Sequence, residues 1–275
     1  MSYKSLLLLL DDGKSNADRV NAAIEIAKSH EAHLTAVALE SLKPQYMIAT
    51  DDAKVKTECI CMANSLVDEF KRHVNHAGIS FDAFTISGNA DATASKMAHF
   101  GRNADLIILP QPGQDSRNYS QMLAFSEEVM LYSGRPILFI PYIGAKRVSF
   151  QKAMISYDGT PAATRAIHDA IPLLRRLDLS TILVVESRKQ LENKSDVQTD
   201  ALSLHLDRHG VNNQVSRVSP GSSLVPVVIH NELVNRDIDL LIVGGYGTPS
   251  LRQKIFGSVT RKLLETMLVP VLMAH

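Results

Sequence analysis

The sequence has no excess charge of either sign and no long hydrophobic run. Lys and Arg together number 29, as do Asp and Glu, so the formal net charge is zero. Nucleic-acid binders usually carry a basic excess, and we therefore expect no nucleic-acid partner. No apolar stretch approaches the ~18 residues of a membrane span, so no membrane segment is predicted. The run 6–10 is too short for a signal peptide and is interpreted as a buried strand.

Cysteine is almost absent. The two cysteines, Cys59 and Cys61, are two residues apart on a predicted helix and should point to nearly opposite faces. A shared disulfide or metal ion is therefore not expected, and reduced thiols are typical of a cytoplasmic protein. Hydrophobic residues make up 45% of the 275 positions, which is typical of a globular chain and excludes a disordered one.

The chain contains an internal repeat. Residues 103–113 resemble residues 237–247, and residues 135–139 resemble residues 269–273, with the same offset of 134. At an offset of 146, Asp12 and Gly13 match Asp158 and Gly159, and Arg19 matches Arg165. A repeat of this length indicates two copies of a domain rather than a solenoid. We predict one domain over residues 1–145 and a second over residues 149–275.

Each copy alternates apolar strands with amphipathic helices. This pattern predicts an α/β fold in which a parallel sheet is covered by helices on both faces. We therefore expect two repeated doubly wound domains, each with a five-stranded parallel sheet. The predicted strands are 6–10, 34–39, 81–86, 106–109 and 137–140 in the first copy, and 153–157, 181–185, 214–218, 240–243 and 269–273 in the second.

Ligands of doubly wound domains bind beyond the carboxyl ends of the strands. In the second copy, residues 157–160, 184–186 and 244–247 follow the first, second and fourth strands. Glycines allow the backbone to approach a ligand closely, and backbone N–H groups at a helix start attract phosphate. The sequence G-x2-G-x9-G-S, which consists of Gly244, Gly247, Gly257 and Ser258, provides both features. It is neither a P-loop nor the G-x-G-x-x-G dinucleotide motif.

With this motif, Asp158-Gly159 and the repeated element order, the whole chain resembles the universal stress protein family in its tandem, two-domain form. The resemblance implies an ATP site, with Mg or Mn as candidate metals. It implies that Asp158 contacts the adenosine, that Val184 or Val185 lies near the adenine, and that the ribose and phosphates are held by Gly244, Gly247, Gly257, Ser258, Val259 and Thr260. Alternatively, Asp158 caps the next helix and the glycines form plain turns.

The first copy departs from this pattern. At the offset of 134, Pro110 replaces Gly244, Pro112 replaces Tyr246, Leu123 replaces Gly257 and Ala124 replaces Ser258. Proline has no N–H to donate, and the leucine side chain fills the space that phosphate would need. We expect the first copy to have lost phosphate binding and to act mainly as a structural partner, with a different ligand there as the alternative.

Histidine pairs occur at 73/76 and at 205/209, where each pair can share one helix face. A zinc site needs a third ligand, and none is recognisable, so we expect solvated helix surface and no metal site. In the family the last strands lie at the sheet edge and pair. We therefore expect the two copies to form an internal pseudo-dimer, with a homodimer of chains as an option.

The leading functional hypothesis is an ATP-binding stress protein with a regulatory or protective role and little turnover. The sequence offers no evident general base and no Walker-type carboxylate for magnesium, which phosphoryl transfer requires. Two alternatives stay open. One is a slow ATPase or nucleotidyl-transfer enzyme that uses the same site, and the other is an interaction module whose nucleotide site is vestigial.

Overall fold

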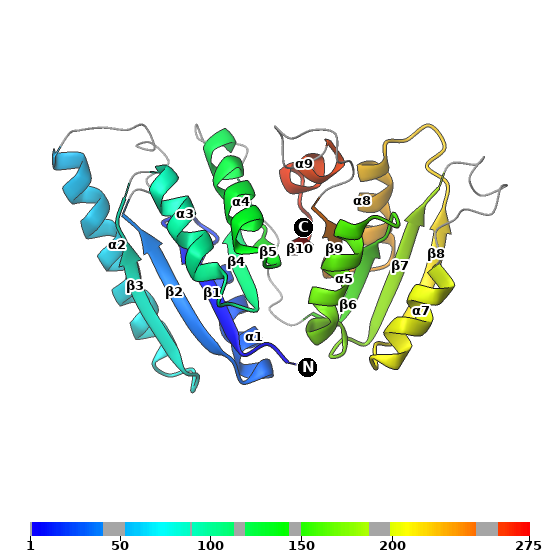
Figure 1. Cartoon of the computed structure of the whole chain (residues 1–275), viewed down its shortest axis with the longest axis horizontal. Coiled ribbons are helices and arrows are strands. Elements are labelled where there is room, and N and C mark those ends of the chain that lie inside the picture. Colours follow the sequence, from blue (N-terminus) through cyan, green and yellow to red (C-terminus); the bar gives the residue numbers. More distant parts are fainter. Residues whose placement is uncertain are drawn as a thin grey trace. The chain divides into compact units, whose positions relative to one another are not determined.

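The computed structural model describes residues 2–40, 53–88, 90–112, 119–142, 150–186, 199–245 and 258–275. The chain divides into two compact units, Ser2–Val148 and Ser149–His275. In both units the helices flank a parallel sheet, which confirms the predicted α/β fold (Figure 1). No described helix combines the length and apolar character needed to cross a membrane.

The first unit contains a parallel sheet with the strand order β3-β2-β1-β4-β5. Helices α3 and α4 lie side by side on one face, and α1 and α2 cover the other (Figure 1). Its elements are β1 (Ser5–Leu10), α1 (Asn16–His30), β2 (His33–Leu39), α2 (Ala53–Val74), β3 (Phe81–Ile86), α3 (Ala90–Gly101), β4 (Leu106–Pro110), α4 (Tyr119–Ser133) and β5 (Ile137–Ile140). The two cysteines of α2 are free thiols, with Cys59 buried and Cys61 exposed.

The second unit repeats this topology with the strand order β10-β9-β6-β7-β8. Helices α5 and α7 lie in front of the sheet and α8 lies behind it (Figure 1). Its elements are β6 (Lys152–Ser156), α5 (Pro161–Leu174), β7 (Leu179–Val185), α7 (Thr199–Arg208), β8 (Asn213–Val218), α8 (Val225–Asn235), β9 (Leu240–Gly244), α9 (Ser258–Glu265) and β10 (Val271–Ala274).

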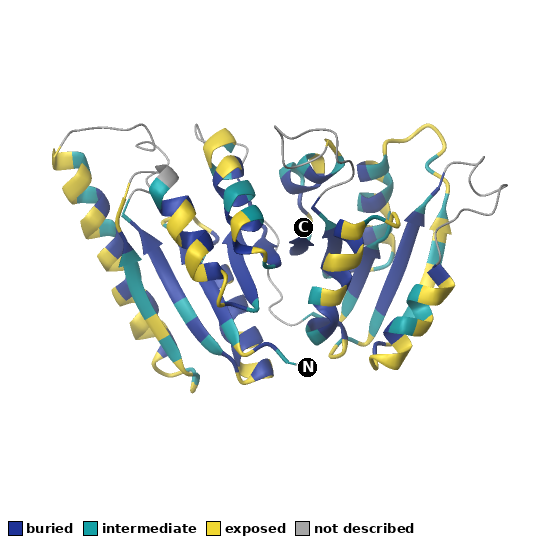
Figure 2. Ribbon diagram, in the orientation of Figure 1, coloured by how far each residue is buried: buried dark blue, intermediate teal, exposed yellow. Residues whose placement is uncertain are grey.

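The central strands form the core of each unit (Figure 2). Leu6 to Leu10 of β1 are all buried, as are Ala153 to Ile155 of β6. A parallel strand covered on both faces buries successive side chains, which explains why these strands are apolar without alternation. The amphipathic helices bury only one side, so their outer faces are exposed (Figure 2).

A carboxylate at the start of the fourth strand holds the first strand of each unit. In the first unit, Asp105 Oδ2 accepts hydrogen bonds from the backbone N–H groups of Lys4 and Ser5, at 2.6 and 3.0 Å. In the second, Asp239 accepts from Gln151 and Lys152, at 2.8 and 3.0 Å. Burial raises the pKa of Asp239, and these two hydrogen bonds oppose the rise. The repeated aspartate therefore fixes the register of two neighbouring parallel strands.

We predict that Asp239→Asn destabilises the second unit by about 1–3 kcal/mol, because the amide nitrogen would face a backbone N–H that has lost its acceptor. Asp237→Asn is the matched control, since Asp237 is exposed and its ion pair with Lys152 is long, at 3.9 Å. It should change stability by less than about 0.5 kcal/mol. Urea denaturation followed by far-UV circular dichroism measures both, and equal effects would contradict the assigned role of Asp239.

Candidate functional site

The strand order of the second unit creates a topological switch point. From β6 the chain continues to β7 and β8 on one side, and it returns on the other side of β6 to form β9. Ser156 near the end of β6 is paired with Val243 near the end of β9, so both strands end at the same edge. In open α/β sheets, ligands bind outside the strand ends at such a point. The residues that follow β6 and β9 are therefore the first candidates for a site.

Asp158 organises the turn after β6. Its Oδ1 accepts hydrogen bonds from the backbone N–H of Thr160 at 3.0 Å and from the Thr160 hydroxyl at 2.7 Å. Thr160 in turn caps α5, because its hydroxyl oxygen accepts from the N–H of Ala163 at 3.2 Å. Both contacts of Asp158 use Oδ1, and its Oδ2 has no hydrogen-bond partner among the described residues. The carboxylate is exposed, so Oδ2 is open to a ligand.

Gly244 ends β9 against the first turn of α5. A Cβ atom at this position would lie 2.5 Å from the backbone nitrogen of Ala163 and 2.8 Å from the carbonyl carbon of Ala162. These are backbone atoms that cannot rotate away, so the close approach of helix and strand requires glycine. The sequence suggested that Gly244 makes room for a ligand, and the structure adds helix packing as a reason for it.

The rest of the glycine motif is described only in part. Gly247 and Gly257 lie outside the described residues. Ser258 opens α9 and is exposed, Val259 is half-buried and Thr260 is buried. Of the two hydroxyls predicted to meet phosphate, that of Ser258 is therefore the accessible one.

Two valines at the end of β7 are followed by a buried acidic residue. Val184 is buried and Val185 is half-buried, so Val185 is the more accessible of the two residues that were predicted to lie near the adenine. Glu186 follows them and is 3% exposed. Its Oε1 accepts from Arg217 Nη1 at 2.8 Å, and Arg217 also donates to the hydroxyl of Thr199. The sequence did not identify this ion pair, because its partners lie 31 residues apart on different strands.

A hollow of about 650 Å³ lies beside the Asp158 turn. It runs along the outer side of the first half of α5 and begins at the turn itself. Its lining residues are Gly159, Pro161, Thr164, Arg165, His168 and Asp169. Arg165 donates to Asp169 at 2.8 Å, so the charges at this surface are balanced.

The strand register corrects the predicted repeat alignment at this turn. Leu106 and Leu240 are equivalent at the offset of 134. Leu6 pairs with Leu106 and Ala153 pairs with Leu240, so Leu6 and Ala153 are equivalent, at an offset of 147. The counterpart of Asp158 is then Asp11, not Asp12 as the sequence indicated. Like Asp158 Oδ1, Asp11 Oδ1 accepts from a backbone N–H two residues later, that of Gly13 at 2.8 Å.

Helix α1 is also shifted from the predicted alignment. Its buried positions match those of α5 at an offset of 143, with Val20 and Ala23 corresponding to Ala163 and Ala166. The offset of 147 given by the strands matches as many buried positions, so Arg19 corresponds to a small buried residue of α5, Ala162 or Ala166, and not to the exposed Arg165. The alignment from sequence was wrong because the loop after β1 is longer than the loop after β6.

Arg19 occupies the first unit's equivalent of the site. Its side chain is completely buried, and Nη2 contacts Asp11 Oδ2 at 2.8 Å and Asn16 Oδ1 at 2.9 Å. Nε donates to the carbonyl oxygen of Leu9 at 3.0 Å. The aspartate oxygen that is open in the second unit is thus engaged by an internal cation in the first.

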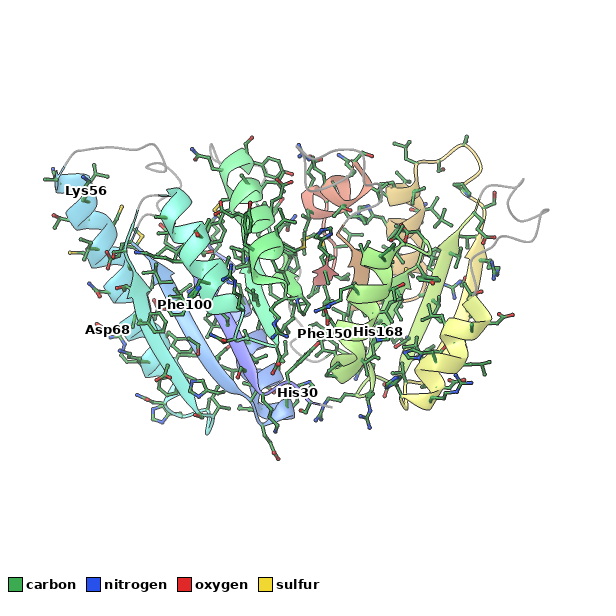
Figure 3. All side chains as sticks on the ribbon, viewed as in Figure 1. His30, Lys56, Asp68, Phe100, Phe150 and His168 are labelled. Carbon is green, nitrogen blue, oxygen red and sulfur yellow. The ribbon has the colours of Figure 1, made fainter. Side chains whose placement is uncertain are left out.

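Three histidines meet on α5 and α7. The ring of His205 lies 4.8 Å from that of His168 and 4.6 Å from that of His209, measured between centroids. Figure 3 labels His168 on α5. The sequence identified only the 205/209 pair, because His168 belongs to another helix. Across the described ranges, no group of three His, Cys, Asp or Glu side chains is arranged to hold a metal ion.

Fold and site together define a protein of two doubly wound α/β units, with an acidic turn and a close glycine at the switch point of the second. The family model described as Universal stress protein family matches residues 149–275. The second unit therefore belongs to the universal stress protein family.

Two solved structures that match almost the whole chain share its fold at low sequence identity. A universal stress protein from Archaeoglobus fulgidus DSM 4304 is 17% identical with a TM-score of 0.75, and the match covers 98% of this chain and 95% of that chain. A functionally unknown protein from Pseudomonas aeruginosa PAO1 is 12% identical with a TM-score of 0.64, over 99% and 92% of the two chains. A universal stress protein from Archaeoglobus fulgidus in complex with dAMP is 15% identical with a TM-score of 0.34, over 50% and 98%. No curated protein sequence matches the chain.

We predict that Gly244→Ala destabilises the second unit by about 1–3 kcal/mol, because the new methyl group would force the α5 backbone away from β9. Gly101→Ala is the control. A Cβ there would lie 2.6 Å from the Cδ1 atom of Ile107, which is the movable tip of a side chain. Thermal unfolding compares the two variants, and an equal or greater loss for Gly101→Ala would contradict the packing role of Gly244.

Acid should weaken the second unit through His205. Burial, and then the neighbouring His168, lower the pKa of His205 below its ordinary value of 6.5. In the unfolded chain His205 takes up a proton near pH 6.5, whereas in the folded chain it does so only at a lower pH. The contribution of neutral His205 to the free energy of unfolding is therefore complete above pH 6.5 and is lost as the pH falls below it. His205→Gln should reduce the loss of urea resistance between pH 7.5 and 5.5, whereas the control His76→Gln should leave it unchanged.

Proposed function

We propose that the second unit binds ATP and that the protein has a regulatory or protective role in the cytoplasm with little catalytic turnover. The observation that carries the proposal is the contrast between Asp158 and Asp11. Both follow the first strand of a unit and both organise the next turn through Oδ1. Asp11 Oδ2 is paired with Arg19, whereas Asp158 Oδ2 is exposed and available to a donor of the adenosine.

The phosphates are assigned to the start of α9. Ser258 presents an exposed hydroxyl there, and the helix dipole favours negative charge at this end. Gly244, Gly247, Gly257, Val259 and Thr260 complete the proposed phosphate and ribose segment. Magnesium or manganese would enter with the phosphates, since Mg²⁺ keeps several waters and needs few protein ligands when it binds a nucleotide.

The two units are proposed to form an internal pseudo-dimer. Within each unit the fifth strand, β5 or β10, has a neighbour on one side only. An unpaired apolar edge promotes aggregation, and one chain that carries two such edges can pair them with each other.

We expect ATP titration by calorimetry to give about one nucleotide per chain. Asp158→Asn keeps an acceptor for Thr160 but removes the charge, so it should weaken ATP binding by about tenfold or more. Asp12→Asn, at an exposed position in the first unit, is the control and should leave the ATP affinity unchanged. Two equivalent sites per chain would contradict the proposal.

The phosphate position is tested by Gly257→Leu, which copies Leu123 of the first unit. The side chain would fill the space in front of the α9 start, and helices tolerate leucine well. Loss of ATP binding with an unchanged circular dichroism spectrum is expected. Unchanged affinity in a folded variant would show that phosphate binds elsewhere.

ATP hydrolysis should be far slower than the ~10 per second typical of enzymes. Backbone N–H groups stabilise phosphate equally in the ground state and the transition state, which gives affinity without rate. Asp158 is assigned to the nucleoside end, and Glu186 is bound to Arg217. A steady-state assay with magnesium and with manganese measures the rate. Several turnovers per second, abolished by changing one acidic residue, would make this protein an enzyme.

A further inference from the structure

The first unit contains a hollow of about 540 Å³ between β3 and α3. This volume lies within the range of small-molecule sites. Among the described strands β3 pairs with β2 alone, so the hollow lies at the free edge of the sheet. Its lining residues are Phe84, Thr85, Ile86 and Ser87 on β3 and just after it, and Ser95, Lys96, His99 and Phe100 on α3.

The hollow exists because the helices cover the two faces of β3 unequally. On one face α2 packs against β3, and Phe70 of α2 meets Phe81 with ring centroids 5.9 Å apart. On the other face α3 packs mainly against α4. Side chains alternate along a strand, so Phe84 and Ile86 belong to the face opposite Phe81, toward α3. Most of β3 is therefore only half-buried, in contrast to the central strands (Figure 2).

Two phenylalanines form an apolar end of the hollow. The rings of Phe84 and Phe100 are tilted by 55°, with centroids 5.2 Å apart. Phe84 is half-buried and Phe100, labelled on α3 in Figure 3, is 41% exposed. The buried Ile86 continues this surface along β3. Aromatic rings prefer tilted or offset neighbours at such distances, so an accessible ring pair suits a third aromatic ring.

Lys96 supplies a positive charge at the other end. Its Nζ donates to the carbonyl oxygen of Ser87 at 2.7 Å, which holds the ammonium group just beyond the end of β3. An ammonium group has three N–H donors, so two remain for a ligand. The described residues that line the hollow include no Asp or Glu. Asp82, on the same face of β3 before Phe84, contacts His33 Nε2 at 3.1 Å.

We propose that this hollow binds a small aromatic carboxylate, with its ring against Phe84 and Phe100 and its carboxylate on Lys96. Positions 84 and 86 are about 6.6 Å apart along an extended strand, so one ring with its own carboxylate can reach both ends. Charge-assisted hydrogen bonds are stronger than neutral ones, so Lys96 favours an anion over a neutral amide. This site belongs to the first unit and does not depend on the ATP site proposed for the second.

The test compares 2-naphthoate with its neutral analogue 2-naphthamide, by ligand-observed NMR on the full chain. Wild-type protein should bind the carboxylate about tenfold or more tightly than the amide. In Lys96→Met this preference should fall to within about threefold, since methionine keeps an apolar stem and suits a helix. Lys71→Met, at an exposed position of α2, is the matched control and should keep the full preference.

Phe100→Ala tests the apolar end and should weaken binding of both ligands about fivefold or more. Ile60→Ala is its control, because Ile60 is similarly exposed, at 42%, on α2. Saturating ATP should leave 2-naphthoate bound, since the nucleotide is assigned to the second unit. The inference is overturned if wild-type protein shows no saturable binding of 2-naphthoate, if Lys96→Met keeps the preference for the carboxylate, or if ATP displaces it.

Discussion

The register of the first strand against the fourth is the constraint on which the site depends. Asp239 sets it by accepting two backbone N–H groups at the start of β6, and Asp105 does the same for β1. Because the strands are parallel and of similar length, a fixed start also fixes where they end. The Asp239 contact lies at the amino ends of β6 and β9. It therefore brings together, at their carboxyl ends, the turn after β6 and the glycine that ends β9.

The two units share one fold and differ in a few side chains at corresponding positions. In the second, Gly244 and Ala162 are small, so α5 lies close to β9 and the carboxylate of Asp158 faces solvent. In the first, Pro110 replaces Gly244, and the buried Arg19 stands where α5 has a small alanine. Arg19 Nη2 engages the Asp11 oxygen from within the protein, so that oxygen is not open in the way that Asp158 Oδ2 is.

The strands, helices and repeat could be predicted from the sequence because apolar periodicity records which faces are buried. The match of Asp105 with Asp239 was also correct, since both carry out the same local task. The match of Asp12 with Asp158 was wrong by one residue, because the loop after β1 is longer and contains two adjacent aspartates. His168 and the Glu186–Arg217 pair were missed because tertiary packing, and not local sequence, brings their partners together.

The contacts at the strand ends hold two carboxylates in fixed positions. Asp158 is held by its own turn, and Glu186 is held by Arg217. A carboxylate that is held through one oxygen keeps the other as an acceptor, so the turn positions Asp158 and leaves its Oδ2 exposed to solvent. The two carboxylates thus differ in what they face, because Asp158 presents an acceptor to solvent at the end of β6 and Glu186 ties the end of β7 to β8 through Arg217.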